Sequence, residues 1–165
     1  MTIRMTEEQF EQKYNRYSQD LFNVAYGYTR CVQDAEDIVQ NVFIKLLQYE
    51  KTFNTTNDEK YWLIRVTINE SINFVKSSYK KKTVLNEEIV RLTSDQTKEN
   101  NDKEILKYFV DMLPEKYKVV VILYYYENMK TVEISNLLKI SEVAIRKRLE
   151  RAREILKKKM EAYNG

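Results

Sequence analysis

The sequence predicts an all-α protein: two small helical domains joined by a flexible linker, with a helix-turn-helix in the C-terminal domain. Apolar residues recur at helical spacing along nearly the whole chain of 165 residues. Two glycines and one proline leave few turn signals for a β fold. A polar stretch separates two periodic regions, so we predict domains at 1–82 and 104–165 and a linker at 83–103.

The N-terminal domain is predicted to contain three helices. The first begins after Thr6, whose hydroxyl forms a capping box with Gln9, and the second begins at Asp34, which we expect to be its N-cap. The first helix is expected to bury Phe10, Tyr14, Tyr17, Leu21, Ala25 and Tyr28. The second is expected to bury Ala35, Ile38, Val42, Leu46 and Tyr49. After the polar loop TFNTTNDEK, the third is expected to bury Tyr61, Ile64, Ile68, Ile72 and Val75.

The predicted linker, TVLNEEIVRLTSDQTKENNDK, lacks sustained periodicity. Beyond it, Ile105, Phe109 and Met112 predict a helix that stops before Pro114, and Pro114 fits the first turn of the next helix. That helix contains VVVILYYY, whose β-branched residues favour a buried strand by propensity. We predict a helix, because no partner strand is apparent elsewhere.

The last part of the chain predicts a helix-turn-helix. Its spacing is a helix at 131–138, a short turn at 139–141 and a second helix from Glu142 to about Met160. Ser141 is placed to cap the second helix.

The composition argues against several classes of protein. With no histidine and one cysteine, Cys31, we expect neither a metal site nor an internal disulfide. The lack of histidine and of glycine-rich loops also argues against an enzyme and against a bound cofactor. The longest apolar run, residues 119–126, is too short to cross a bilayer, and no signal peptide is apparent. We therefore expect a cytoplasmic protein that is not itself a membrane protein.

Charge alternates along the chain in blocks. Residues 1–50 carry 5 basic and 8 acidic groups and residues 83–115 carry 4 and 8, whereas 51–82 carry 7 and 3 and 116–165 carry 12 and 6. Unless this clustering is chance, two basic blocks predict two contacts with a polyanion, and the acidic block between them predicts a segment held away from it.

The final helix combines a basic face with an apolar stripe in ISEVAIRKRLERARE. At helical spacing, one line holds Ile145, Leu149, Ala152 and Leu156, and the other sides hold Val143, Arg146, Lys147, Arg148, Glu150 and Arg151. Early residues of the second helix in such motifs reach base edges, while basic neighbours hold phosphates. This pattern favours a DNA-facing helix over the alternative of a solvated amphipathic one.

The segment YWLIRVTINESINFVK carries a second candidate surface. Trp62, Arg65, Asn69, Asn73 and Lys76 gather on an arc about a quarter-turn from the buried line. An aromatic group among amides and cations suits stacking on unpaired bases, although a lone tryptophan more often belongs to a core. Lys80, Lys81 and Lys82 add charge that would neutralise phosphates.

The helix from Asp34 is expected to bind protein rather than DNA. Its outward side mixes Glu36, Asp37 and Gln40 with Ile44 and Leu47. Acidic groups repel DNA, and exposed aliphatic groups lower solubility unless another protein covers them. The alternative is that Ile44 and Leu47 pack on another helix of the same domain.

Two motifs resemble one known family. DAEDIVQNVFIKLL resembles the second region of sigma-70-type factors, and LPEKYKVVVILYYYENMKTVEISNLLKISEVAIRKRLERAREIL is similar to their fourth region. The arrangement looks like the short, two-domain extracytoplasmic-function sigma factors. The resemblance implies a promoter-specificity subunit that binds core RNA polymerase, recognises promoter DNA as duplex and as opened single strand, and is inhibited by an anti-sigma factor, often a membrane-anchored one.

The resemblance also implies three sets of contact residues. The core-polymerase set is Asp34, Asp37, Gln40, Phe43, Ile44 and Leu47. The minus-ten set is Asn54, Thr56, Asn57, Trp62, Arg65, Asn69, Asn73 and Lys76. The minus-thirty-five set is Ser141, Val143, Arg146, Lys147, Arg148 and Arg151. The acidic linker would lie towards the RNA exit path, where it would mimic nucleic acid.

Three residues depart from the usual pattern of the family. Lys139 stands where the turn commonly has glycine, Asn73 replaces a frequent aspartate, and Lys130 replaces a common serine or similar cap. None of these changes removes a basic residue from the recognition helix.

Two other functions are open from the residues alone. An ordinary repressor or activator would use the helix-turn-helix and dimerise through the first domain on a symmetric site. An adaptor would bind a protein through Ile44 and Leu47 and would not contact DNA. The surface around Trp62, Arg65 and Asn69 argues against both, because neither function uses a stacking platform.

Overall fold

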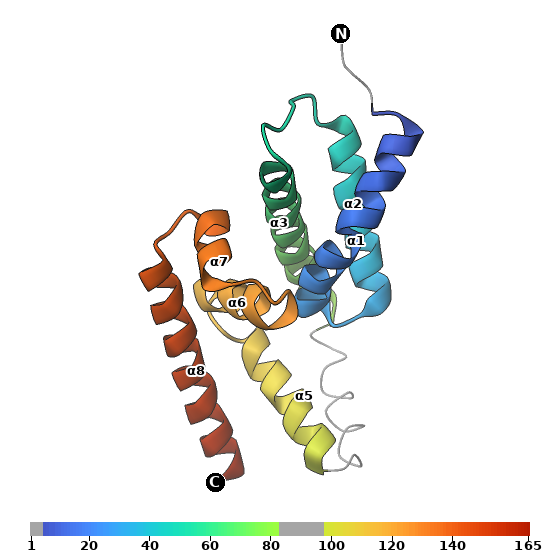
Figure 1. The fold of residues 1–165 in the computed structure, drawn as a ribbon. Helices are drawn as coiled ribbons and strands as arrows, with labels where there is room; N and C mark the ends of the chain where they lie inside the picture. Colours follow the sequence, from blue (N-terminus) through green and yellow to red (C-terminus); the bar gives the residue numbers. More distant parts are fainter. Residues whose placement is uncertain (1–4, 83–97) are drawn as a thin grey trace. The chain divides into compact units, whose positions relative to one another are not determined.

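The computed structural model describes residues 5–82 and 98–165, and every regular element in these ranges is helical (Figure 1). This confirms the predicted all-α class. The elements are α1 (Glu7–Thr29), α2 (Val32–Gln48), α3 (Thr56–Lys82), α5 (Lys98–Asp111), α6 (Glu115–Val121), the π-helix η2 (Ile122–Tyr126), α7 (Thr131–Leu138) and α8 (Glu142–Asn164). The chain divides into two compact units, residues 1–75 and 76–165.

The predicted linker lies mostly outside the described residues. Its last part is helical, because α5 begins at Lys98 rather than near Ile105.

The turn between α1 and α2 places the start of α2 earlier than predicted. The capping box of Thr6 and Gln9 at the start of α1 is confirmed. At its end, Arg30 adopts the left-handed conformation with φ 54° and donates its backbone N–H to Tyr26. The chain reverses there at once, so Cys31 is the N-cap of α2. Asp34 lies in the first turn of α2 and is not the cap, which corrects the prediction.

The core of the first unit is built from facing stripes on its three helices. The predicted residues Tyr17, Leu21, Ala25 and Tyr28 of α1 and Ala35, Ile38, Val42 and Leu46 of α2 are buried, whereas Phe10 and Tyr49 are half-buried and Tyr14 is exposed. The line on α3 is rotated from the prediction: Leu63, Ile64, Thr67, Ile68 and Ser71 are buried, whereas Tyr61, Ile72 and Val75 are half-buried. The Thr67 hydroxyl donates to the Leu63 carbonyl at 2.7 Å, which offsets the cost of burying it.

In the second unit α5 and α6 form a helix pair, and α5 runs beside α8 (Figure 1). Pro114 is the N-cap of α6, and the VVVILYYY segment is helical rather than a strand, as predicted. Its last five residues form a π-helix, in which the Glu127 N–H donates to the Ile122 carbonyl at 3.2 Å. Val110 and Leu113 pack with Val121 and Ala152 in the core of this unit.

The helix-turn-helix has the predicted boundaries at its turn. α7 spans Thr131–Leu138, and α8 begins at Glu142 and continues to Asn164, beyond the predicted end near Met160. Lys139 adopts the left-handed conformation at φ 59° and donates its backbone N–H to the Ser135 carbonyl. The Ser141 hydroxyl accepts from the Ala144 N–H at 3.1 Å, so the predicted cap is confirmed.

Candidate nucleic-acid interface

Helix α8, the second helix of the helix-turn-helix, has one buried side and one exposed basic side. Ile145, Leu149 and Ala152 are buried, as their spacing predicts, and Leu156 on the same line is half-buried. On the other sides, Val143 is 61% exposed, and Arg146, Lys147 and Arg151 are also exposed. Arg148 is half-buried, and Ser141 is exposed but has its hydroxyl engaged in the cap. The exposed start of α8 therefore presents the cations of Arg146 and Lys147 and the methyl groups of Val143 to a ligand.

Glu142 connects the two helices of the motif and orients a predicted DNA-binding arginine. Its Oε1 atom accepts from the Thr131 hydroxyl at 2.9 Å and from Arg146 Nη2 at 2.8 Å. Further along α8, Arg151 pairs with Glu154 at 3.1 Å. Such exposed ion pairs contribute only about 0.2–1 kcal/mol, so phosphate or base contacts can replace them.

Arg153 of α8, which the sequence patterns did not single out, is held by aromatic side chains. Arg153 Nε donates to the Tyr125 hydroxyl at 2.8 Å, and its guanidinium lies 5.7 Å from the ring centres of Tyr124 and Tyr125. These partners stand 28 positions apart in the sequence. No local periodicity could have linked them.

The predicted strand-binding surface on α3 is joined to an aromatic cluster that we define as Tyr49, Phe53 and Trp62. Trp62 is half-buried, with its ring centre 4.5 Å from that of Tyr49 and 5.7 Å from that of Phe53. The Tyr49 and Phe53 rings stack at 5.1 Å. The rest of the predicted set is half-buried Arg65 and exposed Asn54, Thr56, Asn57, Asn69, Asn73 and Lys76. The side chains of Lys80, Lys81 and Lys82 lie outside the described part of the chain.

The outward face of α2 is acidic and aliphatic, as predicted. Ile44 and Leu47 are 51% and 52% exposed, so neither is covered by the fold of its own domain. Asp37 and Gln40 are exposed beside them, and Asp34 is half-buried.

Phe43 is the one predicted contact that this face does not contain. It is 2% exposed and packs against Phe10 and Tyr14 of α1, with ring centres 5.9 and 5.0 Å away. The aromatic side chains of α1 cover Phe43, and its contact with core polymerase stays a prediction. An ion pair between Lys45 and Glu70 joins α2 to α3.

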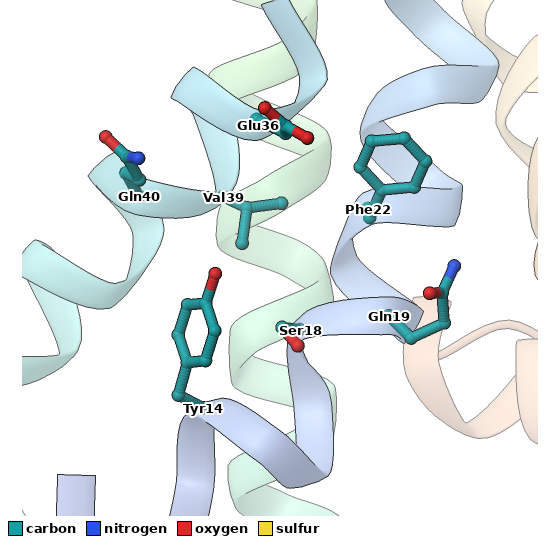
Figure 2. Close-up of a pocket in the computed structure, with 7 residues that line it drawn as sticks. All are labelled: Tyr14, Ser18, Gln19, Phe22, Glu36, Val39 and Gln40. Atoms are coloured by element: carbon teal, nitrogen blue, oxygen red, sulfur yellow. The ribbon is translucent and has the colours of Figure 1, made fainter. Parts of the chain in front are cut away.

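Two hollows lie on the first unit. One, of about 380 Å³, lies between α1 and α2 (Figure 2). Figure 2 shows its lining side chains, which are Tyr14, Ser18, Gln19 and Phe22 from α1 and Glu36, Val39 and Gln40 from α2. The other, of about 730 Å³, lies between α1 and the loop that joins α2 to α3.

Polar contacts fix the start of α3 against α1. Lys13 Nζ lies 2.5 Å from Glu59 Oε2, and the Tyr17 hydroxyl donates to the Thr56 carbonyl at 3.5 Å. The Thr55 hydroxyl accepts from the Asp58 N–H at 3.1 Å. Burial raises the pKa of Tyr17 above its usual value of about 10, and the nearby Glu59 carboxylate acts in the same direction.

Within the described residues, no three or more acidic, cysteine or histidine side chains are grouped so that they could hold a metal ion. Nor does any described helix have the length and apolar character needed to cross a membrane.

The chain matches two family models in the order of its two units. Residues 14–81 match sigma-70 region 2, and residues 103–156 match sigma-70 region 4. In Bacillus subtilis (strain 168), RNA polymerase sigma factor SigV is 27% identical over 141 residues, covering 86% of this chain and 84% of SigV. The ECF RNA polymerase sigma factor SigM of the same organism is 26% identical, covering 89% of this chain and 92% of SigM.

Solved structures share the fold. CnrH, in complex with the cytosolic domain of CnrY, matches with a TM-score of 0.65 and 20% identity, covering 95% of this chain and 90% of CnrH. RpoE from Bartonella quintana, in complex with the anti-sigma factor NepR, matches with a TM-score of 0.63 and 17% identity, covering 93% of this chain and 98% of RpoE. The chain therefore belongs to the sigma-70 family of RNA polymerase sigma factors, in its extracytoplasmic-function (ECF) group. As a sigma factor, it recognises promoters in transcription initiation.

Proposed function

We propose that this chain is a specificity subunit without an active site of its own, which binds core RNA polymerase through α2, the minus-ten element through α3 and the minus-thirty-five element through α8. The observation that carries the proposal is the exposed start of α8, where Val143, Arg146 and Lys147 stand free of the helix-turn-helix core. The two DNA contacts belong to different units of one chain, as a reader of two separated promoter elements requires.

The minus-thirty-five contact is supported by the chemistry of α8. Arginine forms paired hydrogen bonds with the guanine edge in the major groove, and an exposed valine suits a thymine methyl. Arg146 and Arg151 are exposed in the first half of this helix, and Lys147 between them is suited to a phosphate. Half-buried Arg148 has less freedom to reach a base.

The minus-ten contact is supported by the cluster of Tyr49, Phe53 and Trp62 beside exposed amides. Unpaired bases stack on aromatic rings, and each stacked base contributes about 1–3 kcal/mol. Asn69 and Asn73 lie exposed further along α3 and can donate to and accept from base edges.

Protein partners are supported by the exposed aliphatic face of α2. Ile44 and Leu47, flanked by Asp37 and Gln40, form a surface that a partner would cover. We assign this surface to core polymerase. The complexes of CnrH with CnrY and of RpoE with NepR support an anti-sigma factor as a further partner of this chain.

Transcription on fragmented genomic DNA tests the proposal. Core polymerase with this chain should start transcripts at a defined set of sites that core alone does not use. The double variant Arg146→Ala with Arg151→Ala should no longer initiate transcription at these sites, but it should still bind core polymerase. A chain truncated after Lys82 should bind core polymerase but fail to initiate at promoters. Full activity of that fragment would overturn the assignment of the minus-thirty-five contact to the second unit.

A further inference from the structure

Arg153 of α8 and the two tyrosines of η2 that hold it form a surface cluster that none of the predicted contact sets includes. We call Arg153, Tyr124 and Tyr125 the Arg153 cluster. Arg153 is exposed, Tyr125 is 51% exposed and Tyr124 is half-buried. The cluster therefore lies on the surface of the second unit, where a ligand can reach its polar groups.

The charge of Arg153 is not neutralised by an acidic side chain. Arg146 and Arg151 are paired with Glu142 and Glu154 on the same helix. Arg153 makes no such ion pair within the described parts of the chain, and its contacts are with tyrosines. The cluster is thus a cationic surface that lacks an anion.

The hydrogen bond inside the cluster leaves its best anion-binding groups available. Arg153 uses Nε to donate to the Tyr125 hydroxyl at 2.8 Å, so both of its Nη groups remain to donate to oxygen atoms of a ligand. The Tyr125 hydroxyl accepts this bond and can donate its own hydrogen to the same ligand. Three donor groups therefore converge on one anion.

The π-helix holds Arg153 in position before a ligand binds. Tyr124 and Tyr125 are consecutive in η2, and their rings meet edge to face with centres 4.9 Å apart. Both ring centres lie 5.7 Å from the guanidinium of Arg153. An arginine that is already fixed loses less conformational freedom on binding, and π-helical turns are frequent at functional sites.

The position of Arg153 on α8 relates the cluster to the proposed minus-thirty-five contact. Arg153 follows Arg146 by nearly two helical turns, so the two side chains lie close to one line, about 10 Å apart along the helix axis. In homeodomains, early residues of the recognition helix contact bases and its later part contacts the DNA backbone. The same division on α8 would place Arg153 at a phosphate.

We propose that the Arg153 cluster binds one backbone phosphate beside the minus-thirty-five element, with the Nη groups of Arg153 and the Tyr125 hydroxyl as donors. This inference rests on the proposed contact of α8 with that element. It adds η2, the helix before the helix-turn-helix, to the DNA-contacting surface. A carboxylate of a protein partner would suit the same donors, but the line that Arg153 shares with Arg146 favours DNA. Because a phosphate contact fixes the register of a helix in the groove, Arg153 positions the residues that read bases.

The test uses the full-length chain assembled with core polymerase, on a duplex that contains the minus-thirty-five element of a mapped start site. Arg153→Ala should weaken binding about tenfold and lower the salt dependence by about 0.9 in slope, the value for one lost phosphate contact. The loss should be equal for every single-base variant of the element. Tyr125→Phe removes a donor but no charge, so it should weaken binding by a smaller factor and leave the salt slope unchanged. Lys159→Ala is the matched control, because Lys159 is an exposed cation of α8 about 120° around the helix from Arg153.

A second measurement locates the phosphate. Duplexes that carry one uncharged methylphosphonate at successive positions should show which phosphates the wild-type assembly needs. Arg153→Ala should be insensitive to the substitution at one of these positions and remain sensitive at the others. Lys159→Ala should give the wild-type pattern.

The outcomes separate this inference from the proposed function. If the wild-type assembly does not prefer the minus-thirty-five duplex to other DNA, the proposed contact of α8 is wrong and the inference fails with it. If the wild-type assembly does prefer it and Arg153→Ala has wild-type affinity and salt slope, the cluster is not a phosphate site. Loss of affinity for particular base variants alone would make Arg153 a base-reading residue. Loss of core binding, with unchanged DNA affinity in the complex that forms, would assign the cluster to a carboxylate of a protein partner. Each of the last three results would overturn the inference.

Discussion

Arg146 donates to Glu142 one helical turn before it, with 2.8 Å between Nη2 and Oε1, at the start of α8. The same carboxylate oxygen accepts from Thr131 at the start of α7. The side chain proposed to read a base is thus oriented by the residue that joins the two helices of the motif. Because the pair is exposed, it holds the arginine in place without a large cost when DNA replaces the carboxylate.

Substitution Arg146→Ala should weaken binding to minus-thirty-five DNA by about 1–3 kcal/mol and relax the preference at one base pair. Competition assays with single-base variants of the element measure both effects. Lys157→Ala is the control, because Lys157 is exposed on the same helix but lies beyond residue 156, where the region 4 match ends. A uniform loss of affinity for every base variant would instead identify Arg146 as a phosphate contact.

Substitution Lys139→Gly should stabilise the protein by about 1 kcal/mol, because a left-handed conformation is unfavourable for a residue with a Cβ atom. Lys139 is exposed and has φ 59°. Urea unfolding followed by circular dichroism measures the change. The control Lys158→Gly lies within α8 and should lower stability by about 0.5–1 kcal/mol. If both variants lost stability equally, the turn would not require the left-handed conformation.

Two substitutions on α2 should separate binding from folding. Ile44→Asp should abolish binding to core polymerase and leave the unfolding midpoint nearly unchanged, because Ile44 is exposed. Phe43→Ala should destabilise the chain by about 3–5 kcal/mol, because it creates a cavity in a packed core. Thermal unfolding and pull-down with core polymerase provide the two measurements. An unstable Ile44→Asp chain would contradict the exposed position.

Stability should fall as the pH rises above about 10, and Tyr17 should contribute to the fall. Burial raises the pKa of Tyr17 in the folded state, so between the unfolded and folded pKa values the unfolded chain has lost its proton while the folded chain retains it. The stabilising contribution is complete below pH 10 and is lost above it. Chemical unfolding at several pH values measures the free energy of unfolding, which should decline less steeply with pH in Tyr17→Phe than in the wild-type chain. An unchanged slope would show that Tyr17 does not contribute to the loss of stability.

The helices could be predicted where their signals are local. Ser141 at the start of α8 and the spacing of Ile145 and Leu149 give both the boundary and the buried side. The start of α2 could not be predicted, because it depends on a left-handed Arg30, a residue type that carries no signal for that conformation.

The parts of the site that depend on tertiary packing were less predictable. Phe43 lies at the edge of the apolar arc of α2, and its burial depends on Phe10 and Tyr14 of another helix. The pair of Lys13 and Glu59, which stand 46 positions apart, joins α1 to α3 beside the groove of about 730 Å³. Periodicity within one helix carries no information about either arrangement.

The most direct measurement is co-elution of the purified chain with bacterial core RNA polymerase in size-exclusion chromatography, with Asp37→Arg as the control. Asp37 is exposed on α2, so the control should fold normally. The account predicts that the wild-type chain co-elutes with core polymerase and that Asp37→Arg does not. Failure of the wild-type chain to co-elute, together with tight binding of duplex DNA by the chain alone, would contradict the assignment as a polymerase subunit.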